Sequence, residues 1–379
     1  MNNKMQKKII FFITEDWYFW SHRLPIARAA RDAGFQVVIA TRVHSHGARI
    51  KKEGFRLIPL QLERRGRNVV TEALTLVDIV RIYLLEKPDI VHHVAVKPVI
   101  YGSIAAMIAR VPFIVNAMAG LGYIFINDGL KASLVRRIFV LIYRCAFISK
   151  STVALFQNPE DLNLFVSLGI VARKRTSLIR GSGVDISTYD ITPEPSGVIT
   201  IMLASRMLWD KGIGELVEAA GLLHSRGILC RIVLVGKPDD DNPQSISEEM
   251  LRCWHCKGVV EWWGYQENMV EVLSKSHIVV LPSYREGVPK ILIEAAACGK
   301  SIVATDVPGC REIVHHDDNG LLVPAYDGKS LSEALEVLIQ DSELRKKMGR
   351  RGREIVRREF SEEIVIKKTM QLYEGLIGK

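Results

Sequence analysis

Two cationic side chains follow a predicted strand in the second half of the chain. Arg206 and Lys211 come directly after the apolar run Val198–Ala204. A doubly wound parallel sheet binds its ligand at the carboxyl ends of its strands. Two cations at such an end can hold a diphosphate, and the arginine can do so through two parallel hydrogen bonds. The alternative interpretation is a pair of solvated charges at the start of a helix.

Two carboxylates lie farther along, around the predicted start of another helix. Glu286 and Glu294 flank Pro289, which suits the first position of a helix, and the strand Ile278–Leu281 precedes them. A helix N-terminus favours anionic phosphate, and the two carboxylates can accept hydrogen bonds from sugar and ribose hydroxyls. Two glutamates at this spacing are ordinarily surface residues. Here apolar neighbours predict a buried helix, in which a charge requires a partner.

Three other motifs are weaker. Asp239–Asp241 contains the Asp-x-Asp spelling of a metal site, but it lies in a polar loop between prolines without a convergent ligand set. Cys253 and Cys256 form a single Cys-x-x-Cys, so a structural zinc is not expected. Neither Gly120–Gly122 nor Gly181–Gly183 completes a dinucleotide fingerprint, and no complete phosphate-loop motif occurs. The sequence therefore predicts no metal and no cofactor.

Two α/β sheets are required to position these side chains. Short β-branched runs alternate with amphipathic helical stretches, which is typical of βαβ units around parallel sheets. Ile186–Gly197, with two prolines, is the predicted linker. We expect two doubly wound, Rossmann-like domains that face each other across a cleft, residues 1–188 and 189–379, with the last helix (about 362–379) packing back on the first. The predicted strands are Ile9–Ile13, Gln36–Thr41, Ile90–His93, Phe113–Asn116, Thr152–Phe156, Ser177–Ile179, Val198–Ala204, Arg231–Val235, Val259–Trp262, Ile278–Leu281, Ile302–Ala304 and Leu321–Val323.

Composition and charge narrow the classes of protein. The 379 residues are 48% hydrophobic and 25% charged, which excludes a largely disordered chain. Residues 1–190 hold 27 Lys and Arg against 14 Asp and Glu, which predicts an anionic partner. An anionic membrane surface is preferred to nucleic acid, because no nucleic-acid motif accompanies the charge. Lys131–Phe147, basic and apolar at helical spacing, is either a membrane-facing helix or a partly buried one.

The location of the protein follows from what its sequence lacks. No apolar run reaches the length of a membrane span, and Ile9–Ile13 is too short for the core of a signal peptide. The six cysteines show no disulfide-framework spacing. We expect a reduced, cytoplasmic protein, peripheral at the inner face of the cell membrane.

Together these motifs resemble glycosyltransferase family 4, retaining enzymes of the GT-B fold. The resemblance rests on Arg206-x4-Lys211 and on Glu286-Gly-Val-Pro with its second glutamate at 294. It extends over nearly the whole chain. Lys97-Pro-x-x-Tyr-Gly and Gly120-Leu-Gly122-Tyr are most similar to the bacterial subgroup that extends saccharides on polyprenyl-diphosphate carriers, including N-acetylgalactosaminyltransferases. Further matching segments are Gly181–Asp185, Pro308–Glu312 and Asn319–Pro324.

The resemblance implies an activity and its residues. A hexose or N-acetylhexosamine would pass from a nucleotide sugar, preferably a UDP-sugar, to a lipid-linked saccharide in surface polysaccharide or glycoprotein glycan assembly. The leaving diphosphate would help deprotonate the acceptor hydroxyl, without a metal. The implied catalytic residues are Arg206, Lys211 and Glu286. The implied donor-binding residues are Gly181, Gly264, Tyr265, Glu286, Gly287, Val288, Pro289 and Glu294. Of these, Gly264 and Tyr265 would lie beside the base together with Trp263, and Glu294 would hold the ribose. Glu312 would lie nearby. The acceptor or cleft candidates are His22, Arg23, Lys97, Gly120 and Gly122.

Two other functions and one structural point stay open. A UDP-sugar 2-epimerase of the same architecture would convert the donor without an acceptor, and a catalytically silent, membrane-associated assembly partner would bind the donor without turnover. The intact donor motifs argue against both. Thr14–Arg23, the loop expected after the first strand, is aromatic rather than glycine-rich and leaves the acceptor geometry open. His92 and His93 are either catalytic or buried strand residues.

Overall fold

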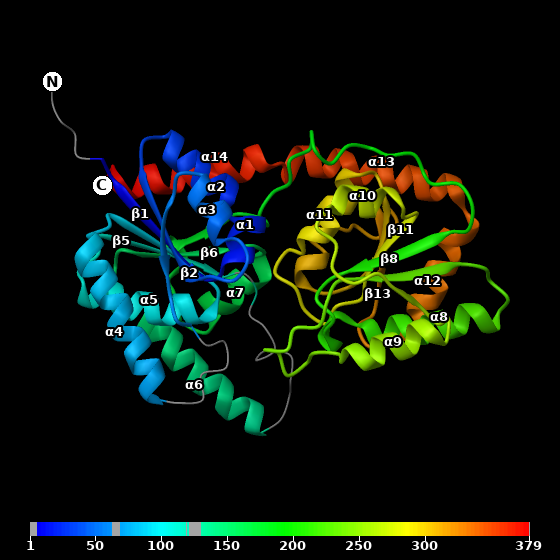
Figure 1. The fold of residues 1–379 in the computed structure, drawn as a ribbon, viewed down its shortest axis with the longest axis horizontal. Coiled ribbons are helices and arrows are strands. Elements are labelled where there is room, and N and C mark those ends of the chain that lie inside the picture. Colours follow the sequence, from blue (N-terminus) through cyan, green and yellow to red (C-terminus); the bar gives the residue numbers. More distant parts are fainter. Residues whose placement is uncertain (1–5, 63–68, 119, 121–129, 379) are drawn as a thin grey trace. The chain divides into compact units, whose positions relative to one another are not determined.

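The chain consists of two compact α/β units (Figure 1). The computed structural model describes residues 6–62, 69–118, 120 and 130–378. Unit 1 comprises Met1–Ser182 together with Glu363–Lys379, and unit 2 comprises Gly183–Glu362. Each unit is built on one parallel sheet with helices, which confirms the predicted α/β class. The division after Ser182 lies slightly before the boundary expected at 188.

Unit 1 contains a seven-stranded parallel sheet in the order β3-β2-β1-β4-β5-β6-β7. The order reverses between β1 and β4, the point at which doubly wound sheets bind ligands. The sequence did not predict β3, because this strand is only four residues long, is not fully buried and contains an arginine and a proline. The strands are β1 (Lys8–Glu15), β2 (Gln36–Arg42), β3 (Arg56–Pro59), β4 (Ile90–Val94), β5 (Phe113–Met118), β6 (Thr152–Phe156) and β7 (Thr176–Leu178).

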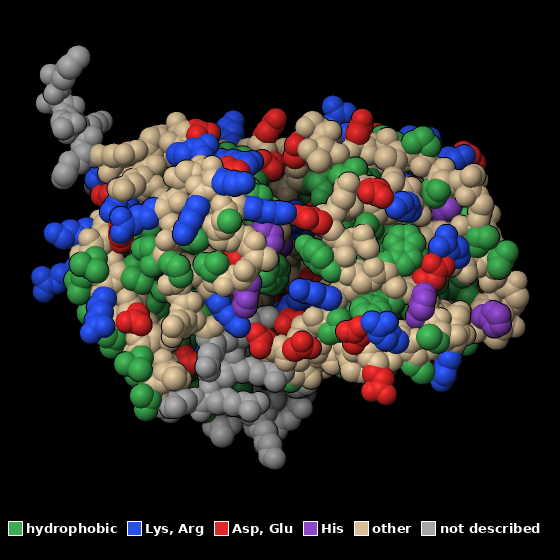
Figure 2. Space-filling model, in the orientation of Figure 1, with side chains coloured by type: hydrophobic (Ala, Val, Ile, Leu, Met, Phe, Trp, Pro, Cys, Tyr) green, Lys and Arg blue, Asp and Glu red, His purple; other side chains and the backbone are tan. Residues whose placement is uncertain are grey.

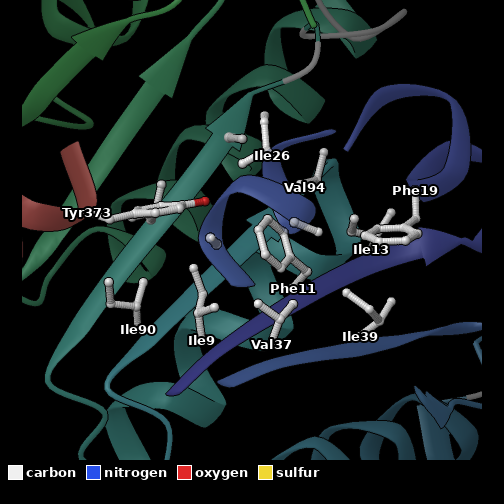
Figure 3. Packing of buried hydrophobic residues seen from close by; sticks show 14 of the residues in the cluster. Ile9, Phe11, Ile13, Phe19, Ile26, Val37, Ile39, Ile90, Val94 and Tyr373 are labelled. Atoms are coloured by element: carbon white, nitrogen blue, oxygen red, sulfur yellow. The ribbon is translucent and has the colours of Figure 1, made fainter. Parts of the chain in front are cut away.

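Both faces of the unit 1 sheet are buried. Phe11 packs on one face with Val37 and Tyr373, while Phe12 packs on the other with Val38. Figure 3 shows Tyr373 reaching this core from α14, so the last helix is part of unit 1. The helices are α1 (Asp16–His22), α2 (Leu24–Asp32), α3 (Gly47–Lys52), α4 (Val69–Glu86), α5 (Val96–Ile108), α6 (Leu130–Ala146), α7 (Pro159–Ser167) and α14 (Glu362–Ile377).

Unit 2 contains a six-stranded parallel sheet in the order β10-β9-β8-β11-β12-β13, which reverses between β8 and β11. The strands are β8 (Thr200–Ala204), β9 (Arg231–Val235), β10 (Glu261–Trp262), β11 (Ile278–Leu281), β12 (Ser301–Thr305) and β13 (Gly320–Val323). The helices are α8 (Ile213–Ser225), α9 (Glu248–Cys256), α10 (Met269–Ser274), α11 (Lys290–Ala297), α12 (Gly328–Gln340) and α13 (Ser342–Glu359). Within the described ranges, none of the helices has the length and hydropathy that a bilayer-spanning segment needs.

The predicted linker Ile186–Gly197 is instead a fixed part of unit 2. Glu194 forms two hydrogen bonds of 2.9 and 3.0 Å with the guanidinium of Arg345. The backbone carbonyl of Tyr189 accepts a hydrogen bond from Arg353, and that of Pro195 accepts one from His277. The prolines exclude regular structure here, but side chains of the unit satisfy the backbone, so the linker interpretation was wrong.

Candidate functional site

The loops that follow β8 and β11 meet where the strand order of unit 2 reverses. The amide of Tyr284 donates to the carbonyl of Asp210 at 3.0 Å, which joins the loop after β11 to the short 3-10 turn Trp209–Lys211. Gly212 ends this turn with a φ of +70°, and a Cβ there would lie 2.0 Å from the carbonyl oxygen of Pro282. Only glycine fits this close approach. The two loops therefore hold each other in a fixed register.

Lys211 and Glu286 are brought together by this register. Nζ of Lys211 lies 2.5 Å from Oε1 of Glu286, and 17% and 13% of the two side chains are exposed. The pair is thus largely shielded from water, which strengthens its electrostatic interaction. The structure places two of the three predicted catalytic residues in contact at the strand ends, as expected for a site that binds a charged ligand.

Arg206, the third predicted catalytic residue, is paired with Asp239. Nη1 of Arg206 lies 2.6 Å from Oδ2 of Asp239, whose side chain is 12% exposed. Asp239 belongs to the Asp-x-Asp spelling, which forms an ion pair here, and the described residues contain no cluster of three or more His, Cys, Asp or Glu side chains with metal-site geometry. Sequence reasoning missed this partnership. The sequence feature that could have indicated this pair is an acidic residue in the loop after β9, the strand that pairs with β8.

Glu286 is held by the 3-10 turn Pro308–Cys310. A Cβ added to Gly309 would lie 2.2 Å from the carbonyl oxygen of Gly287, so that turn packs directly on the backbone beside Glu286. The predicted donor residues Gly287, Val288 and Pro289 are buried. Helix α11 begins at Lys290, with Pro289 as its extended N-cap rather than its first helical residue.

Glu294 is buried on α11 with two partners. Its Oε1 accepts a hydrogen bond from the Tyr189 hydroxyl at 2.8 Å and lies 3.0 Å from Nζ of Lys290. Burial and the nearby Glu294 carboxylate raise the pKa of Tyr189, so this tyrosine is a neutral donor. The predicted burial of this helix is confirmed. Tyr189 itself was missed, because it lies in the segment interpreted as a linker.

Asp210 is a further acidic residue of this site that the sequence did not single out. Burial raises the pKa of its carboxyl; Glu286 adds to this effect, and Lys211 and Arg206 oppose it. Its Oδ1 is buried without a hydrogen-bond partner among the described residues. Beside it, the Tyr284 hydroxyl donates to Glu215 at 2.7 Å. Asp239, Glu286 and Asp210 therefore lie near the two cations at these strand ends.

The predicted base-binding residues are divided by the structure. Gly264 has a φ of +68°, and its carbonyl accepts from the amide of Gly236, so it lies at the strand ends. The neighbouring Tyr265 is 61% exposed, with Nζ of Lys237 at 5.7 Å from its ring centroid. Trp263 instead lines a cavity with residues at the amino ends of the strands, among them Arg231. Of these three residues, only Gly264 and Tyr265 lie at the end of the sheet that carries Arg206 and Lys211.

The candidates of unit 1 lie on several elements. Thr14–Arg23 forms the end of β1 and helix α1, not a loop, and His22 stacks on Tyr18 with ring centroids 4.1 Å apart. Arg23 is only 2% exposed, which favours a structural role for it. Lys97, on α5, forms an ion pair of 2.7 Å with Glu72 on α4.

The remaining glycines give less information. Gly120 has a φ of +124°, and Gly181, just before the division after Ser182, has a φ of +66°, so both adopt conformations that favour glycine. Gly122 lies outside the described residues. Glu312 lies shortly after the turn that packs on Gly287. The acceptor roles of all the unit 1 candidates stay predictions.

His92 and His93 are buried strand residues of β4. His93 is hydrogen-bonded through Nε2 to the Tyr83 hydroxyl at 2.9 Å and through Nδ1 to Asn116 at 2.8 Å. Burial lowers the pKa of His93 to about 4. His92 is hydrogen-bonded to the Tyr373 hydroxyl, and burial lowers its pKa as well. Both imidazoles are therefore neutral packing groups near pH 7, which favours the structural interpretation over the catalytic one.

Comparisons with known proteins agree in both units. Residues 8–158 match the family model described as glycosyl transferase 4-like, and residues 189–355 match the model described as glycosyl transferases group 1. Among curated relatives, the chain is 28% identical over 372 residues to N,N'-diacetylbacillosaminyl-diphospho-undecaprenol alpha-1,3-N-acetylgalactosaminyltransferase of Campylobacter jejuni. The alignment covers 94% of this chain and 95% of that protein.

Solved structures show the same fold at lower identity. The sucrose-phosphate synthase of Thermosynechococcus elongatus superposes with a TM-score of 0.79 at 18% identity, covering 98% of this chain and 99% of that one. Anabaena HepE, solved in complex with UDP and glucose, superposes with a TM-score of 0.76 at 17% identity, again covering 98% and 99%. The predicted GT-B fold class is confirmed.

Proposed function

Because the chain belongs to the glycosyltransferases that the group 1 and 4-like models describe, we propose that it extends a lipid-linked saccharide. It transfers a hexose or N-acetylhexosamine from a nucleotide sugar, preferably a UDP-sugar, to a saccharide on a polyprenyl-diphosphate carrier. The relative from Campylobacter jejuni, whose name specifies such an acceptor, supports this substrate class. The product belongs to surface polysaccharide or glycoprotein glycan assembly.

The observation that carries the proposal is the position of Arg206 and Lys211. Both lie at the carboxyl ends of the strands where the order of the unit 2 sheet reverses, and Glu286 lies beside them. A nucleotide-sugar diphosphate is the ligand chemistry that two convergent cations at such an end recognise. The HepE complex, which holds UDP and glucose on the same fold, supports a uridine donor.

The site residues of unit 2 have different roles in the transfer. Arg206 and Lys211 neutralise the charge that develops on the diphosphate as the bond to the sugar breaks, an effect realised mainly in the transition state. Glu286 and the backbone of Gly287–Pro289 orient the sugar, and Glu294 holds the ribose. The leaving diphosphate takes the proton of the acceptor hydroxyl, and the anomeric configuration is retained. The two cations supply the positive charge, so no metal is needed.

The proposal is tested by turnover with a panel of donors. Purified protein is mixed with UDP-, GDP- and ADP-sugars in EDTA, with and without a polyprenyl-diphosphate-linked N-acetylhexosamine. We expect acceptor-dependent release of UDP from one UDP-sugar. That release should be lost in Arg206→Ala and kept in Arg226→Ala, which removes a guanidinium from a surface ion pair with Glu336. Epimerised donor without acceptor would assign an isomerase, and nucleotide binding without turnover on any acceptor would assign a silent partner.

We also propose that unit 1 docks on an anionic membrane surface, at the cytoplasmic face where the acceptor saccharide is presented. Helix α6 buries Phe139 and Tyr143, but it exposes Ile138 and Leu141 beside Arg137. Helix α4 exposes further apolar side chains, and α5 packs against both helices. Figure 2 shows hydrophobic side chains among basic ones over the region of α4. Exposed apolar groups with nearby arginines suit an interface with anionic lipid.

Vesicle binding tests this surface. Replacing Ile138 and Leu141 together with glutamate should weaken partitioning onto phosphatidylglycerol-containing vesicles by at least about tenfold, because two apolar side chains that would enter the lipid are lost and negative charge is added. Sedimentation with vesicles measures the partitioning. The control is Leu229→Glu, which changes a residue of unit 2 that is 76% exposed. Equal partitioning of all three proteins would contradict the proposed surface.

A further inference from the structure

Asp239 is a carboxylate placed beside a cation that is expected to bind phosphate. It lies 2.6 Å from Arg206, and nothing in the proposed transfer requires an acidic residue at that point. Lys211 also has a carboxylate partner, but that partner, Glu286, has its own role in orienting the sugar. Asp239 is therefore an acidic residue in contact with a predicted phosphate-binding cation whose function is unexplained.

The position of Asp239 is fixed by the loop that carries it. Its backbone amide donates to Oγ of Ser245 at 2.9 Å, and its carbonyl accepts from the amide of Asn242 at 2.7 Å. The turn around Asp239 is thus closed from both sides. These hydrogen bonds fix the backbone that carries the carboxylate.

The same loop is bound to the segment that carries Arg206. The amide of Met207 donates to the backbone carbonyl of Lys237 at 3.1 Å, and the amide of Trp209 donates to the backbone carbonyl of Gln244 at 2.8 Å. Gly236 packs so closely that an added Cβ would lie 1.8 Å from the carbonyl oxygen of Ser205. The backbone segments that carry Arg206 and Asp239 are therefore joined, which keeps the carboxylate near any diphosphate that Arg206 holds.

We propose that Asp239 is a positioning residue that orients Arg206 and limits how tightly the nucleoside diphosphate is retained. A guanidinium has five N–H donors, and the contact with Asp239 uses one side of it, so Arg206 can hold Asp239 and a phosphate together. The fixed carboxylate then repels the diphosphate across the guanidinium. Repulsion favours release of the product nucleotide after transfer. This inference rests on the proposed function of the site.

The substitution Asp239→Asn separates the two effects of Asp239, the orientation of Arg206 and the repulsion of the diphosphate. Asp239→Asn keeps an oxygen that can accept the hydrogen bond from Arg206, but it removes the negative charge. We expect UDP to bind the variant about tenfold more tightly. Both kcat and KM for the donor should fall, with kcat/KM changed by less than about threefold, because release of the tighter-held product limits turnover. Asp239→Glu, which keeps the charge, should stay close to the natural protein.

Calorimetry of UDP binding and steady-state kinetics on the whole chain measure these quantities. The matched control is Asp240→Asn, an equal charge change at the exposed neighbouring residue. Tighter UDP binding in Asp239→Asn alone, with the joint fall in kcat and KM, supports the inference. Equal or weaker binding in that variant overturns it, since Asp239 would then only hold Arg206. Absence of UDP binding to the natural protein would instead overturn the proposed donor.

Discussion

Replacing Lys211 with alanine is expected to lower kcat/KM by about a hundredfold to a thousandfold. Two losses combine in this variant. The ammonium that neutralises the leaving diphosphate disappears, and Glu286, whose side chain is 13% exposed, is left without its partner at 2.5 Å. An unpaired carboxylate in a shielded site also repels the diphosphate. The loss should therefore exceed that of a simple truncation.

Acceptor-dependent release of UDP measures this effect. Lys275→Ala is the matched control, because Lys275 forms an exposed ion pair with Glu271 on α10, outside the site described above. Circular dichroism of both variants should match that of the natural protein, since Lys211 lies on a short turn outside the hydrophobic core. A Lys211→Ala enzyme that keeps more than about a tenth of the natural kcat/KM would contradict a role in leaving-group stabilisation.

Replacing Gly212 with valine is expected to destabilise unit 2 by about 4 kcal/mol. The residue has a φ of +70°, which a β-branched side chain rarely adopts, and a Cβ there would lie 2.0 Å from the carbonyl oxygen of Pro282. The backbone must shift to relieve this overlap. Because Pro282 precedes the loop of Glu286, activity should fall together with stability.

Thermal or urea unfolding measures the change in Gly212→Val. Gly221→Ala is the control, since Gly221 lies inside helix α8 and no atom lies within 4 Å of the added Cβ. An alanine in an open helical position should stabilise the protein slightly, by up to about 1 kcal/mol. If Gly212→Val unfolds at the same denaturant concentration as the natural protein, the close packing of the β8 and β11 loops is incorrect.

The sequence predicted the buried parts of the fold well. Strands such as β8, β9 and β11 are short, mostly apolar runs, because both faces of a parallel sheet are covered. The edge strand β3 was not predicted, because a short strand that is not fully buried needs no apolar run. Ile186–Gly197 was misinterpreted for a related reason. Prolines indicate irregular backbone, but only tertiary contacts such as Glu194 with Arg345 show that this backbone is fixed.

The candidate site was predictable where local spacing determines it. Arg206 and Lys211 follow one strand, so their common position is visible in the sequence. The partners of these cations come from distant loops, and their pairing depends on strand order. No local pattern relates Asp239 to Arg206, because β9 becomes a neighbour of β8 only when the sheet forms.

Arg206 and Lys211 are proposed to hold the diphosphate of a nucleotide sugar in unit 2. Titration calorimetry with UDP in the presence of EDTA tests this role. We expect one UDP to bind each chain of the natural protein, and the affinity to fall by at least about a hundredfold when both residues are alanine. UDP binding of equal strength in the double variant, or its absence in the natural protein, would contradict the claim.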